Sequence, residues 1–398
     1  MSVIEHFWYR VRPAHLALYP LSVLFGAALG VRRTLYARGV LRSQQMPVPV
    51  IVVGNLTVGG SGKTPLTLWL AQRLRAAGHR PGIVTRGYRG SERLQEVHPH
   101  SAPAQAGDEA VLLARRAGCP VFAGRDRVAA ARALLRAHSA CDVLLSDDGL
   151  QHYRLARAFE IAVIDGARGF GNGLLLPAGP LREPRSRLRE VDAIVVNTGL
   201  VNTGLVNTGL VNTGVVHAGV VNAGVVNAGQ VNAGVANGGA FNAGVANAAG
   251  TEPSVISAGV DLTGLPVPSY AMRLEGERLV NLKHPARAVP LSDFAGRSVH
   301  ALAGIGHPRR FFAQLEGAGL SVAPHPFPDH FAFAPDDLAF AGDAPLLMTE
   351  KDAVKCAAFA RESWWYLPVT AQVDPALAAL LLDKLEPPHG APHGPETA

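Results

Sequence analysis

Residues 51–74, "IVVGNLTVGGSGKTPLTLWLAQRL", join an apolar run, a glycine-rich turn and an amphipathic stretch. The β-branched run over 48–55 predicts a buried strand, and the leucines spaced by four over 64–77 predict a helix that stops at Gly78. A strand, a glycine turn ending in Lys-Thr and a helix together form a phosphate-binding loop of the P-loop type. The stretch therefore predicts a nucleotide-binding α/β domain.

The turn covers residues 57–64, "TVGGSGKT", with Thr57 where the usual pattern has glycine. Its glycines permit positive φ and a close approach of the backbone, so that N–H groups at the helix start can bind phosphate oxygens. Lys63 is expected to bridge the β- and γ-phosphates, and the Thr64 hydroxyl to ligate Mg²⁺. The predicted nucleotide-binding residues are Thr57, Val58, Gly59, Gly60, Ser61, Gly62, Lys63 and Thr64.

Strands and helices alternate after this unit. Further strands are predicted at 80–88, 141–149, 159–166 and 191–197, and helices at 107–117 and 126–137. This alternation predicts a doubly wound, mostly parallel sheet of the P-loop NTPase type. Farther on, "SVHALAGIGHPRRFF" and "APLLMTEKDAVK" each predict a strand, a turn and a helix, which indicates a second, smaller α/β lobe.

Residues 196–250 form eleven five-residue units, beginning "VNTGL VNTGL", without a charged residue. A fixed short period predicts either a β-solenoid, with laddered asparagines and inward valines, or an irregular surface insert. The tract is similar to a pentapeptide-repeat solenoid, with Thr or Ala where that family prefers Leu or Phe. Leaving so many apolar residues in water is costly, which favours an ordered coil. The near-identity of the units indicates recent duplication and predicts that the tract is dispensable for chemistry.

The chain of 398 residues has a net charge of +6 and a pI near 9.5, which suits an anionic partner such as a nucleotide, a phospholipid or a nucleic acid. Its basic residues are scattered, so a nucleic-acid-binding stripe is not indicated. The cysteines, Cys119, Cys141 and Cys356, lie far apart without a CxxC motif. That usage fits a reducing compartment and excludes a disulfide framework or a cysteine zinc site.

The N-terminal stretch 15–31, "HLALYPLSVLFGAALGV", is mostly apolar and flanked by arginines. It is shorter than the roughly 20 apolar residues of a spanning helix, and it contains Pro20. A signal peptide would carry the nucleotide loop away from ATP. Two alternatives remain: an interfacial helix with its arginines against anionic headgroups, or a buried helix of the soluble fold. The flanking arginines favour the interfacial helix.

The strand "CDVLLSDDG" ends in Asp147 and Asp148, where a Walker B carboxylate belongs. One is expected to hold the metal or its water, and the other to orient a reacting group. By pattern alone, Asp108 and Glu109 of "GDEA" are ordinary acids at a helix start, where they favour the helix dipole. Likewise, His330 of "FPDHF" alone indicates only a structural histidine.

As a whole, the chain resembles the tetraacyldisaccharide 4′-kinases of lipid A biosynthesis. The resemblance is carried, in order, by "GNLTVGGSGKTP", "TRGYRG", "GDEA", "SDDGLQHYRL", "LLPAGPLREP", "GIGHPRRFF", "FPDHF" and "TEKDAVK". It implies transfer of the γ-phosphate of ATP to the 4′-hydroxyl of a tetraacyl glucosamine disaccharide 1-phosphate, with Mg²⁺. It also implies work at the cytoplasmic face of the bacterial inner membrane, with the lipid A disaccharide precursor and the membrane surface as partners and no nucleic acid.

The same resemblance implies roles for individual residues. Asp108 matches the proposed general base and His330 its partner in a dyad. The implied catalytic residues are Asp108, His330, Lys63 and Asp148. The implied metal-associated residues are Thr64, Asp147 and Glu109. The residues expected at the substrate are Arg86, Tyr88, Arg127 (as a phosphate contact), Gln151 and His152.

The expected organisation is an interfacial helical segment (1–47), a P-loop kinase core (48–195), the repeat insertion (196–250), a C-terminal α/β lobe (251–386) and a disordered tail (387–398). The chief alternative is a soluble P-loop ATPase or GTPase acting as a partner-regulating switch. It does not account for "LLPAGPLREP" or for the arginine-flanked N-terminus. A third class is an interaction protein whose repeat tract is the active part.

Overall fold

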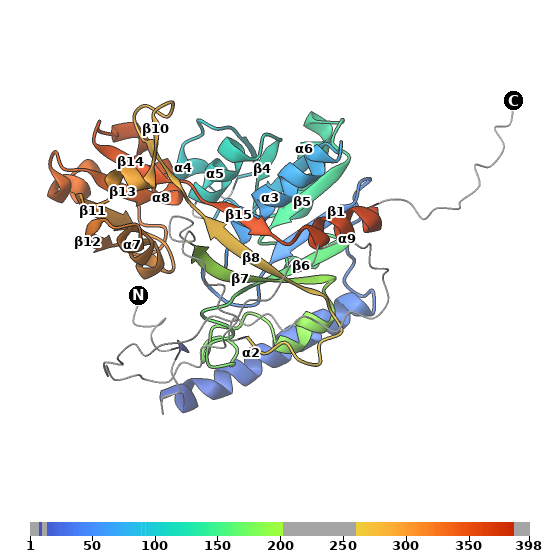
Figure 1. The fold of residues 1–398 in the computed structure, drawn as a ribbon. Coiled ribbons are helices and arrows are strands. Elements are labelled where there is room, and N and C mark those ends of the chain that lie inside the picture. Colours follow the sequence, from blue (N-terminus) through green and yellow to red (C-terminus); the bar gives the residue numbers. More distant parts are fainter. Residues whose placement is uncertain (1–7, 10–13, 89, 92, 202–259, 386–398) are drawn as a thin grey trace, which may run out of the picture.

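The computed structural model describes residues 8–9, 14–88, 90–91, 93–201 and 260–385, and its described strands form two sheets (Figure 1). The solenoid expected within 196–250 lies outside the described residues from residue 202 onward, and so does the expected disordered tail. A mixed α/β fold with a large, mostly parallel sheet is confirmed.

Nine of the described strands form the larger sheet. Their spatial order is β15 (Thr370–Val373), β8 (Ser269–Glu275), β7 (Ala193–Val201), β6 (Phe159–Asp165), β1 (Val50–Gly54), β5 (Val143–Asp147), β2 (Pro81–Thr85), β4 (Val121–Ala123) and β3 (Gln95–Val97). The strands from β8 to β4 pair in parallel, and the two edge strands are antiparallel to their neighbours. Because the chain order changes direction around β1, the strand before the glycine turn lies in the middle of the sheet.

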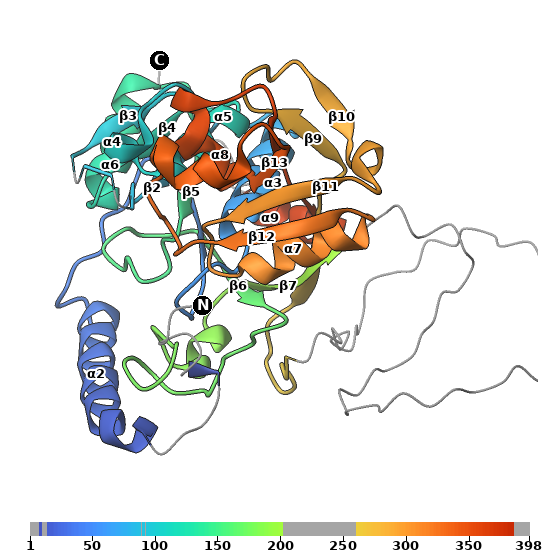
Figure 2. The same ribbon diagram turned by 90° about the vertical axis from the view of Figure 1, so that its left-hand side faces the viewer.

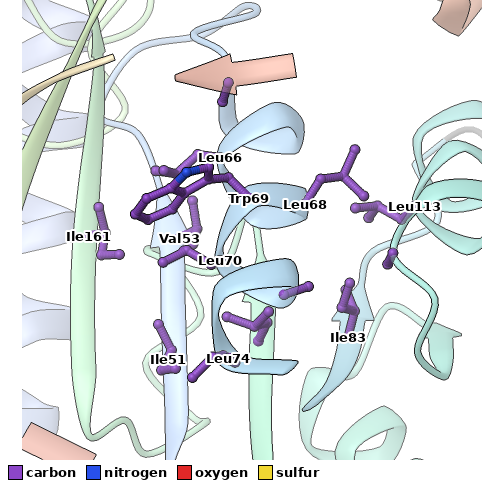
Figure 3. Packing of buried hydrophobic residues seen from close by; sticks show 14 of the residues in the cluster. Ile51, Val53, Leu66, Leu68, Trp69, Leu70, Leu74, Ile83, Leu113 and Ile161 are labelled. Atoms are coloured by element: carbon purple, nitrogen blue, oxygen red, sulfur yellow. The ribbon is translucent and has the colours of Figure 1, made fainter. Parts of the chain in front are cut away.

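The larger sheet is covered on both faces, which explains why its strands are continuously apolar. Alternate residues of β1 point to opposite faces: Ile51 and Val53 contact one apolar cluster, and Val50 and Val52 contact another. Figure 3 shows the first cluster, in which helix α3 (Lys63–Ala76) packs on β1 through Leu66, Leu70 and Leu74. Helices α5 (Asp108–Arg116) and α9 (Pro375–Leu385) also cover this face, together with the short helix α4 (Pro103–Ala106).

The other face is covered by helix α6 (Arg127–Ala137), the 3₁₀ helix η1 (Arg185–Arg189) and the irregular segments between β5 and β6 and between β6 and β7. Asp126 caps α6 by accepting hydrogen bonds from the N–H groups of Val128 and Ala129. All of the strands and helices predicted for residues 48–195 are present, with bounds shifted by a few residues at most.

The N-terminal helix α2 (Ala14–Ala37) lies along the outside of the molecule, away from the smaller sheet (Figure 2). It is held by Ser22, whose hydroxyl donates to the carbonyl of Leu175 at 2.9 Å and accepts from the N–H of Ala178 at 3.0 Å. Pro20 lies inside the helix. In the part of the chain that is described, no helix combines the length and hydropathy that crossing a membrane requires.

Six further strands form the smaller sheet, in the order β10 (Ala288–Pro290), β9 (Arg278–Asn281), β14 (Trp364–Leu367), β13 (Leu346–Thr349), β11 (Ser298–Ala303) and β12 (Ser321–Pro326). Helix α7 (Pro308–Gly317) and the 3₁₀ helix η3 (Leu291–Phe294) cover one face. Helix α8 (Glu350–Cys356) and the 3₁₀ helices η4 (Pro335–Ala341) and η5 (Ala357–Phe359) cover the other. The predicted second α/β lobe is therefore present.

The C-terminal segment divides between the two sheets. Strand β8 pairs in parallel with β7, β15 pairs with β8, and α9 packs against the face that carries α3. The chain thus leaves the larger sheet for the smaller one after β8 and returns after β14, which ties the lobes together at two crossings (Figure 1). The first unit of the repeat tract, 196–200, lies within β7.

Candidate active site

The glycine-rich turn lies between β1 and α3, as expected from the sequence. Helix α3 begins at Lys63, directly after Gly62, which caps it with φ 95° in the left-handed region. The Lys63 ammonium lies 3.2 Å from the Asn55 side-chain oxygen and 3.5 Å from Asp148 Oδ1. On the outer side, the N–H of Val58 donates to the carbonyl of Pro180 at 2.9 Å. The turn is therefore fixed at both ends, with the lysine directed toward the end of β5.

Asp147 is the last residue of β5 and is fully buried. The Thr67 hydroxyl donates to its Oδ1 at 3.1 Å, and its Oδ2 has no hydrogen-bond partner among the described residues. Burial, together with the nearby carboxylate of Glu109, raises the pKa of Asp147 to about 7. A buried carboxylate oxygen without a partner fits a cation, so this residue suits the metal-associated role implied by the family resemblance.

Asp148 follows at φ 49°, a left-handed conformation that is strained for a residue with a side chain. The Arg182 guanidinium donates to both of its carboxylate oxygens, at 2.9 and 3.2 Å. Although burial alone raises the pKa of Asp148, the charges of Lys63 and Arg182 hold it well below the usual range. Asp148 is thus an ionised carboxylate between two cations, facing the phosphate-binding turn.

Arg182 was not singled out from the sequence, although it lies in the quoted motif "LLPAGPLREP". Its position follows from the pairing of 181–182 with the phosphate-binding turn: its N–H donates to the carbonyl of Leu56 at 2.6 Å, and Leu181 forms a bridge with Thr57. Its guanidinium also donates to the backbone and side-chain oxygens of Asn55. The sequence offers one signal for this role, which is an arginine within an irregular, proline-rich segment.

Asp108 and His330 form a hydrogen-bonded pair. Nδ1 of His330 lies 2.9 and 3.0 Å from the two Asp108 oxygens, although the residues are 222 positions apart. Lys351 Nζ lies 3.2 Å from Nε2 of the same ring, and an ammonium can only donate, so Nε2 accepts and Nδ1 carries the proton given to Asp108. His330 has φ 58°, and it and Asp148 are the only non-glycine residues with positive φ in the described ranges. The predicted dyad is therefore assembled in the structure.

Lys351, at the start of α8, collects the acidic groups around the pair. Its ammonium lies 3.0 Å from Glu109, 3.1 Å from Asp329 and 4.0 Å from Asp108. Although burial alone lowers the pKa of Lys351, the carboxylates of Glu109 and Asp108 raise it above its usual value, and the amine stays charged. Its motif, "TEKDAVK", contributes to the family resemblance, but the sequence alone did not predict a role for the lysine. Its signal is a charged residue at the start of a helix that follows a buried strand.

Burial alone raises the pKa of Asp108, but the hydrogen bond from His330 and the charge of Lys351 outweigh it, and the pKa of Asp108 is lowered. Asp108 is consequently ionised at neutral pH, which a general base requires. The same lysine comes from the smaller sheet's lobe, whereas Asp108 and Glu109 begin α5 of the larger lobe. Helices α5 and α8 lie side by side in both ribbon views, joined also by an ion pair of 2.7 Å between Arg116 and Glu350 (Figure 2).

The two lobes also meet above the phosphate-binding turn. A Cβ placed on Gly306 would lie 3.2 Å from the backbone nitrogen of Gly60 and 3.7 Å from a carboxylate oxygen of Asp329. A side chain at position 306 would therefore be tight against the turn after β1, and the glycine lets the loop after β11 pack closely on that turn. This contact brings the Asp329–His330 turn beside the phosphate-binding turn.

The residues expected at the substrate fall into two groups. Tyr88 is 48% exposed, and its ring lies edge-on against His330 with centroids 5.0 Å apart. The exposed Arg86 lies with its guanidinium 5.9 Å from the Tyr88 ring. These two side chains form a solvent-exposed rim beside the dyad, where an acceptor can reach them.

Of the other three, Arg127 is buried, whereas Gln151 and His152 are half-buried. Arg127 is 3% exposed, and its guanidinium donates to the carbonyls of Gly124, Asp147 and Asp148 at 3.2 to 3.5 Å. Burial lowers the pKa of Arg127 to about 10. In this arrangement it supports the end of β5, and the expected contact with phosphate would require it to leave these carbonyls.

Gln151 donates to the carbonyl of Asn55 at 3.0 Å, which ties the segment after β5 to the segment after β1. Burial and the charge of Arg127 lower the pKa of His152 to about 4, so its ring is neutral at pH 7. Both residues are half-buried, and Gln151 is held against the segment that leads into the phosphate-binding turn.

The metal-associated residues implied by the resemblance do not form a preassembled cage. Within the described ranges, no group of three or more His, Cys, Asp or Glu side chains is placed to hold a metal ion. Glu109 pairs with Lys351, yet it also lies close enough to Asp147 to raise the pKa of that residue. Glu109 thus connects the dyad's cluster with the end of β5. Thr64 is the second residue of α3, one position after Lys63.

Comparison with known proteins identifies the family. The family model described as tetraacyldisaccharide-1-P 4′-kinase matches residues 14–264 and 206–386. A tetraacyldisaccharide 4′-kinase of Nitrosococcus oceani is 44% identical over 387 residues, covering 97% of this chain and 95% of the relative. One from Azoarcus sp. (strain BH72) is 45% identical over 393 residues, covering 98% and 97%.

Among solved structures, the "apo" form of LpxK from Aquifex aeolicus in complex with ATP aligns with a TM-score of 0.67. It is 27% identical in sequence, and the match covers 94% of this chain and all of that one. The alternative of a partner-regulating switch ATPase is not favoured by these relatives. Because the family model and relatives above 40% identity span nearly the whole length, this chain belongs to the tetraacyldisaccharide-1-P 4′-kinase family and is a kinase.

Proposed function

We propose that this chain transfers the γ-phosphate of ATP to the 4′-hydroxyl of a tetraacyl glucosamine disaccharide 1-phosphate, a step of lipid A biosynthesis. The observation that carries the proposal is the Asp108–His330 pair, held beside a phosphate-binding turn by the contact of Gly306 with Gly60. A base next to a bound triphosphate is what transfer to a sugar hydroxyl requires.

Residues 57–64 would hold the triphosphate through backbone N–H groups and Lys63. Mg²⁺ would be held by the Thr64 hydroxyl and by Asp147, whose Oδ2 is buried without a partner among the described residues, with Glu109 nearby. When bound, the metal neutralises charge on the β- and γ-phosphates. Arg182 and Lys63 flank Asp148, and their positive charge would offset the negative charge that develops on a phosphoryl group transferred from a nucleotide in this turn.

Asp108 would accept the proton of the 4′-hydroxyl as its oxygen attacks the γ-phosphorus. The bond between that phosphorus and the β–γ bridging oxygen breaks, and ADP leaves. The Nδ1–H group of His330 donates a hydrogen bond to Asp108 and so orients the carboxylate. Lys351, donating to the far nitrogen of the ring, keeps this tautomer. Arg86 and Tyr88, on the exposed rim beside the dyad, would contact the sugar headgroup.

Transfer of label from [γ-³²P]ATP tests the proposal directly. Purified full-length chain, incubated in detergent with the tetraacyl disaccharide 1-phosphate and Mg²⁺, should yield a glycolipid labelled at the 4′ position. Lys63→Ala protein serves as the matched control and should give no labelled lipid. ATP hydrolysis without a labelled glycolipid would contradict the proposed acceptor.

We further propose that α2 lies in the headgroup region at the cytoplasmic face of the inner membrane. Its outward side exposes large apolar residues: Tyr19, Leu21, Val23, Leu24 and Val31. The exposed arginines Arg32 and Arg38 follow at its C-terminal end, where they can pair with anionic headgroups. An enzyme docked in this way could phosphorylate a headgroup while the acyl chains stay in the bilayer.

Flotation with vesicles of phosphatidylethanolamine and phosphatidylglycerol tests this docking. The double variant Leu24→Gln/Val31→Gln, at positions 66% and 61% exposed, should lose most of its binding, because each substitution removes apolar area from the lipid contact. Leu94→Gln, at an exposed leucine outside α2, is the matched control and should bind like the unaltered chain. Equal binding by all three proteins would refute the role of α2.

A further inference from the structure

Asn197, the second residue of the first repeat unit, is 1% exposed in the middle of β7, where the pairing with β8 becomes irregular. Its side-chain Nδ2 donates to the carbonyl of Ser61 at 3.1 Å, and its Oδ1 accepts from the N–H of Gly199 at 3.0 Å. Its own backbone carbonyl accepts from the N–H of Gly166 at 2.8 Å. Both ends of the amide are therefore engaged, and one of them engages the phosphate-binding turn.

The amide lies directly against the residue that precedes helix α3. A Cβ placed on Gly62 would come within 2.6 Å of Asn197 Nδ2 and 2.9 Å of Met272 Cε. Gly62 also has φ 95°, so both the close packing and the backbone conformation disfavour a side chain at position 62. Any movement of Asn197 would leave this side of the turn without its only described side-chain donor to Ser61.

The hydrogen bond to Ser61 determines where the next N–H group points. In a trans peptide, the carbonyl and the following N–H point in opposite directions. Since the Ser61 carbonyl is held toward β7, the Gly62 N–H is directed to the other side of the turn, away from β7. N–H groups directed in that way at the start of a helix form the phosphate-binding surface of such turns.

We propose that Asn197 is a positioning residue for the triphosphate: its amide holds the Ser61–Gly62 peptide with its N–H toward the phosphates. This inference rests on the proposed binding of ATP by residues 57–64. It gives the first repeat unit a function that the repeated sequence alone does not reveal. The unit at 201–205 has the same five residues, "VNTGL", yet the contact belongs to the copy whose register in β7 places its asparagine at the turn.

Binding of MgATP to the full-length chain, measured by calorimetry, tests the proposal. Asn197→Ala should raise the Kd for MgATP about tenfold, the effect of losing one well-placed buried hydrogen bond. Asn197→Asp should do at least as much, because it keeps the acceptor for Gly199 but loses the donor to Ser61. In kinase assays the KM for ATP should rise, while the KM for the disaccharide stays unchanged.

Two variants separate positioning from general damage to β7. Thr198→Val removes the adjacent hydrogen bond to the Met272 carbonyl, 3.2 Å long, and should lower the melting temperature without weakening MgATP binding. Asn202→Ala changes the same position of the next, identical unit and should leave MgATP binding unchanged.

The proposal is overturned if both Asn197 variants bind MgATP like the unaltered chain, or if Thr198→Val or Asn202→Ala weakens binding equally. Lys63→Ala shows which premise has failed. If it too binds MgATP normally, the turn itself is not the phosphate site. If it loses binding while the Asn197 variants keep it, the turn assignment stands and only the role of Asn197 is wrong.

Discussion

The phosphate-binding turn is continuous in sequence and comes from one lobe, whereas the Asp108–His330 pair joins residues 222 positions apart from two lobes. The turn depends on β1 and α3, which pack on one another through fully buried residues of the larger sheet's core (Figure 3). The pair depends on Lys351, Gly306 and the contact of α5 with α8. Damage to the first should therefore remain local, while damage to the contacts between lobes should reach the second.

This difference also separates binding from chemistry. The turn and Lys63 hold a group that is charged throughout the reaction, so they contribute to nucleotide binding as well as to transfer. The pair acts only when the acceptor loses its proton, so its loss should lower kcat and leave ATP affinity intact. Variants in the two regions should consequently give different kinetic patterns.

The largest effect is expected for Lys63→Ala. Losing the ammonium between Asn55 and Asp148 removes charge stabilisation of the transferring group and should lower kcat/KM about 1,000-fold or more. Steady-state phosphorylation of the disaccharide measures it. The matched control, Lys283→Ala, changes a half-exposed lysine on the smaller lobe and should leave kcat/KM unchanged. Near-normal turnover by Lys63→Ala would remove the turn from the mechanism.

The next effect is expected for Asp108→Ala and Asp108→Asn, which should lower kcat about 100- to 1,000-fold without changing MgATP affinity. The reason is that neither side chain can accept the hydroxyl proton. Single-turnover assays with saturating ATP measure the chemical step, and Asp336→Asn, at an exposed aspartate, is the control. Weakened ATP binding in the Asp108 variants would contradict the separation of nucleotide binding, in the turn, from chemistry, in the pair.

A smaller loss should follow from Lys351→Met, which leaves Glu109, Asp329 and Asp108 without their shared cation. Breaking a buried ionic cluster costs about 3 kcal/mol in the free energy of unfolding. We expect kcat to fall about 10- to 100-fold, because His330 loses the donor that fixes its tautomer. Thermal melts and kcat test this together.

Two variants sharpen the assignment for Lys351. Lys351→Arg keeps the charge and should recover part of both losses. Lys384→Met breaks an ion pair with Asp192 near the surface and should alter neither by much. A Lys351→Met protein that is destabilised but has normal kcat would limit the lysine to a structural role.

Much of the fold could be predicted because its signals are local. The run before Gly54, the glycine turn and the leucine spacing of α3 are each contained in a few residues, and the alternation of strands and helices implies a parallel sheet. The path of the C-terminal segment could not be predicted in the same way. Strands β8 and β15 join the larger sheet through pairing with β7, and no local pattern specifies which sheet a strand enters.

The site divides along the same line. Lys63 and the two aspartates at the end of β5 follow from spacing alone, whereas Asp108 and His330 needed the family resemblance. Arg182 and Lys351 were assigned no role because their partners are remote: 34 residues separate Arg182 from Asp148, and 242 separate Lys351 from Glu109. Single-sequence patterns carry no information about contacts of that range.

The smallest effect is expected for deletion of residues 202–250. Strand β7 keeps its pairing with β6 and β8 through Val201, and Asn197 keeps its bond to Ser61, so kcat and the KM for ATP should stay within about twofold. Deletion of 196–250 removes the same repeats together with the end of β7, and it should abolish activity. Activity assays and melting temperatures of the two deletions give the comparison. Normal activity of both deletions would show that the first unit is as dispensable as the others and that the phosphate-binding turn needs no support from β7. Loss of activity in both would assign a function to the repeats themselves.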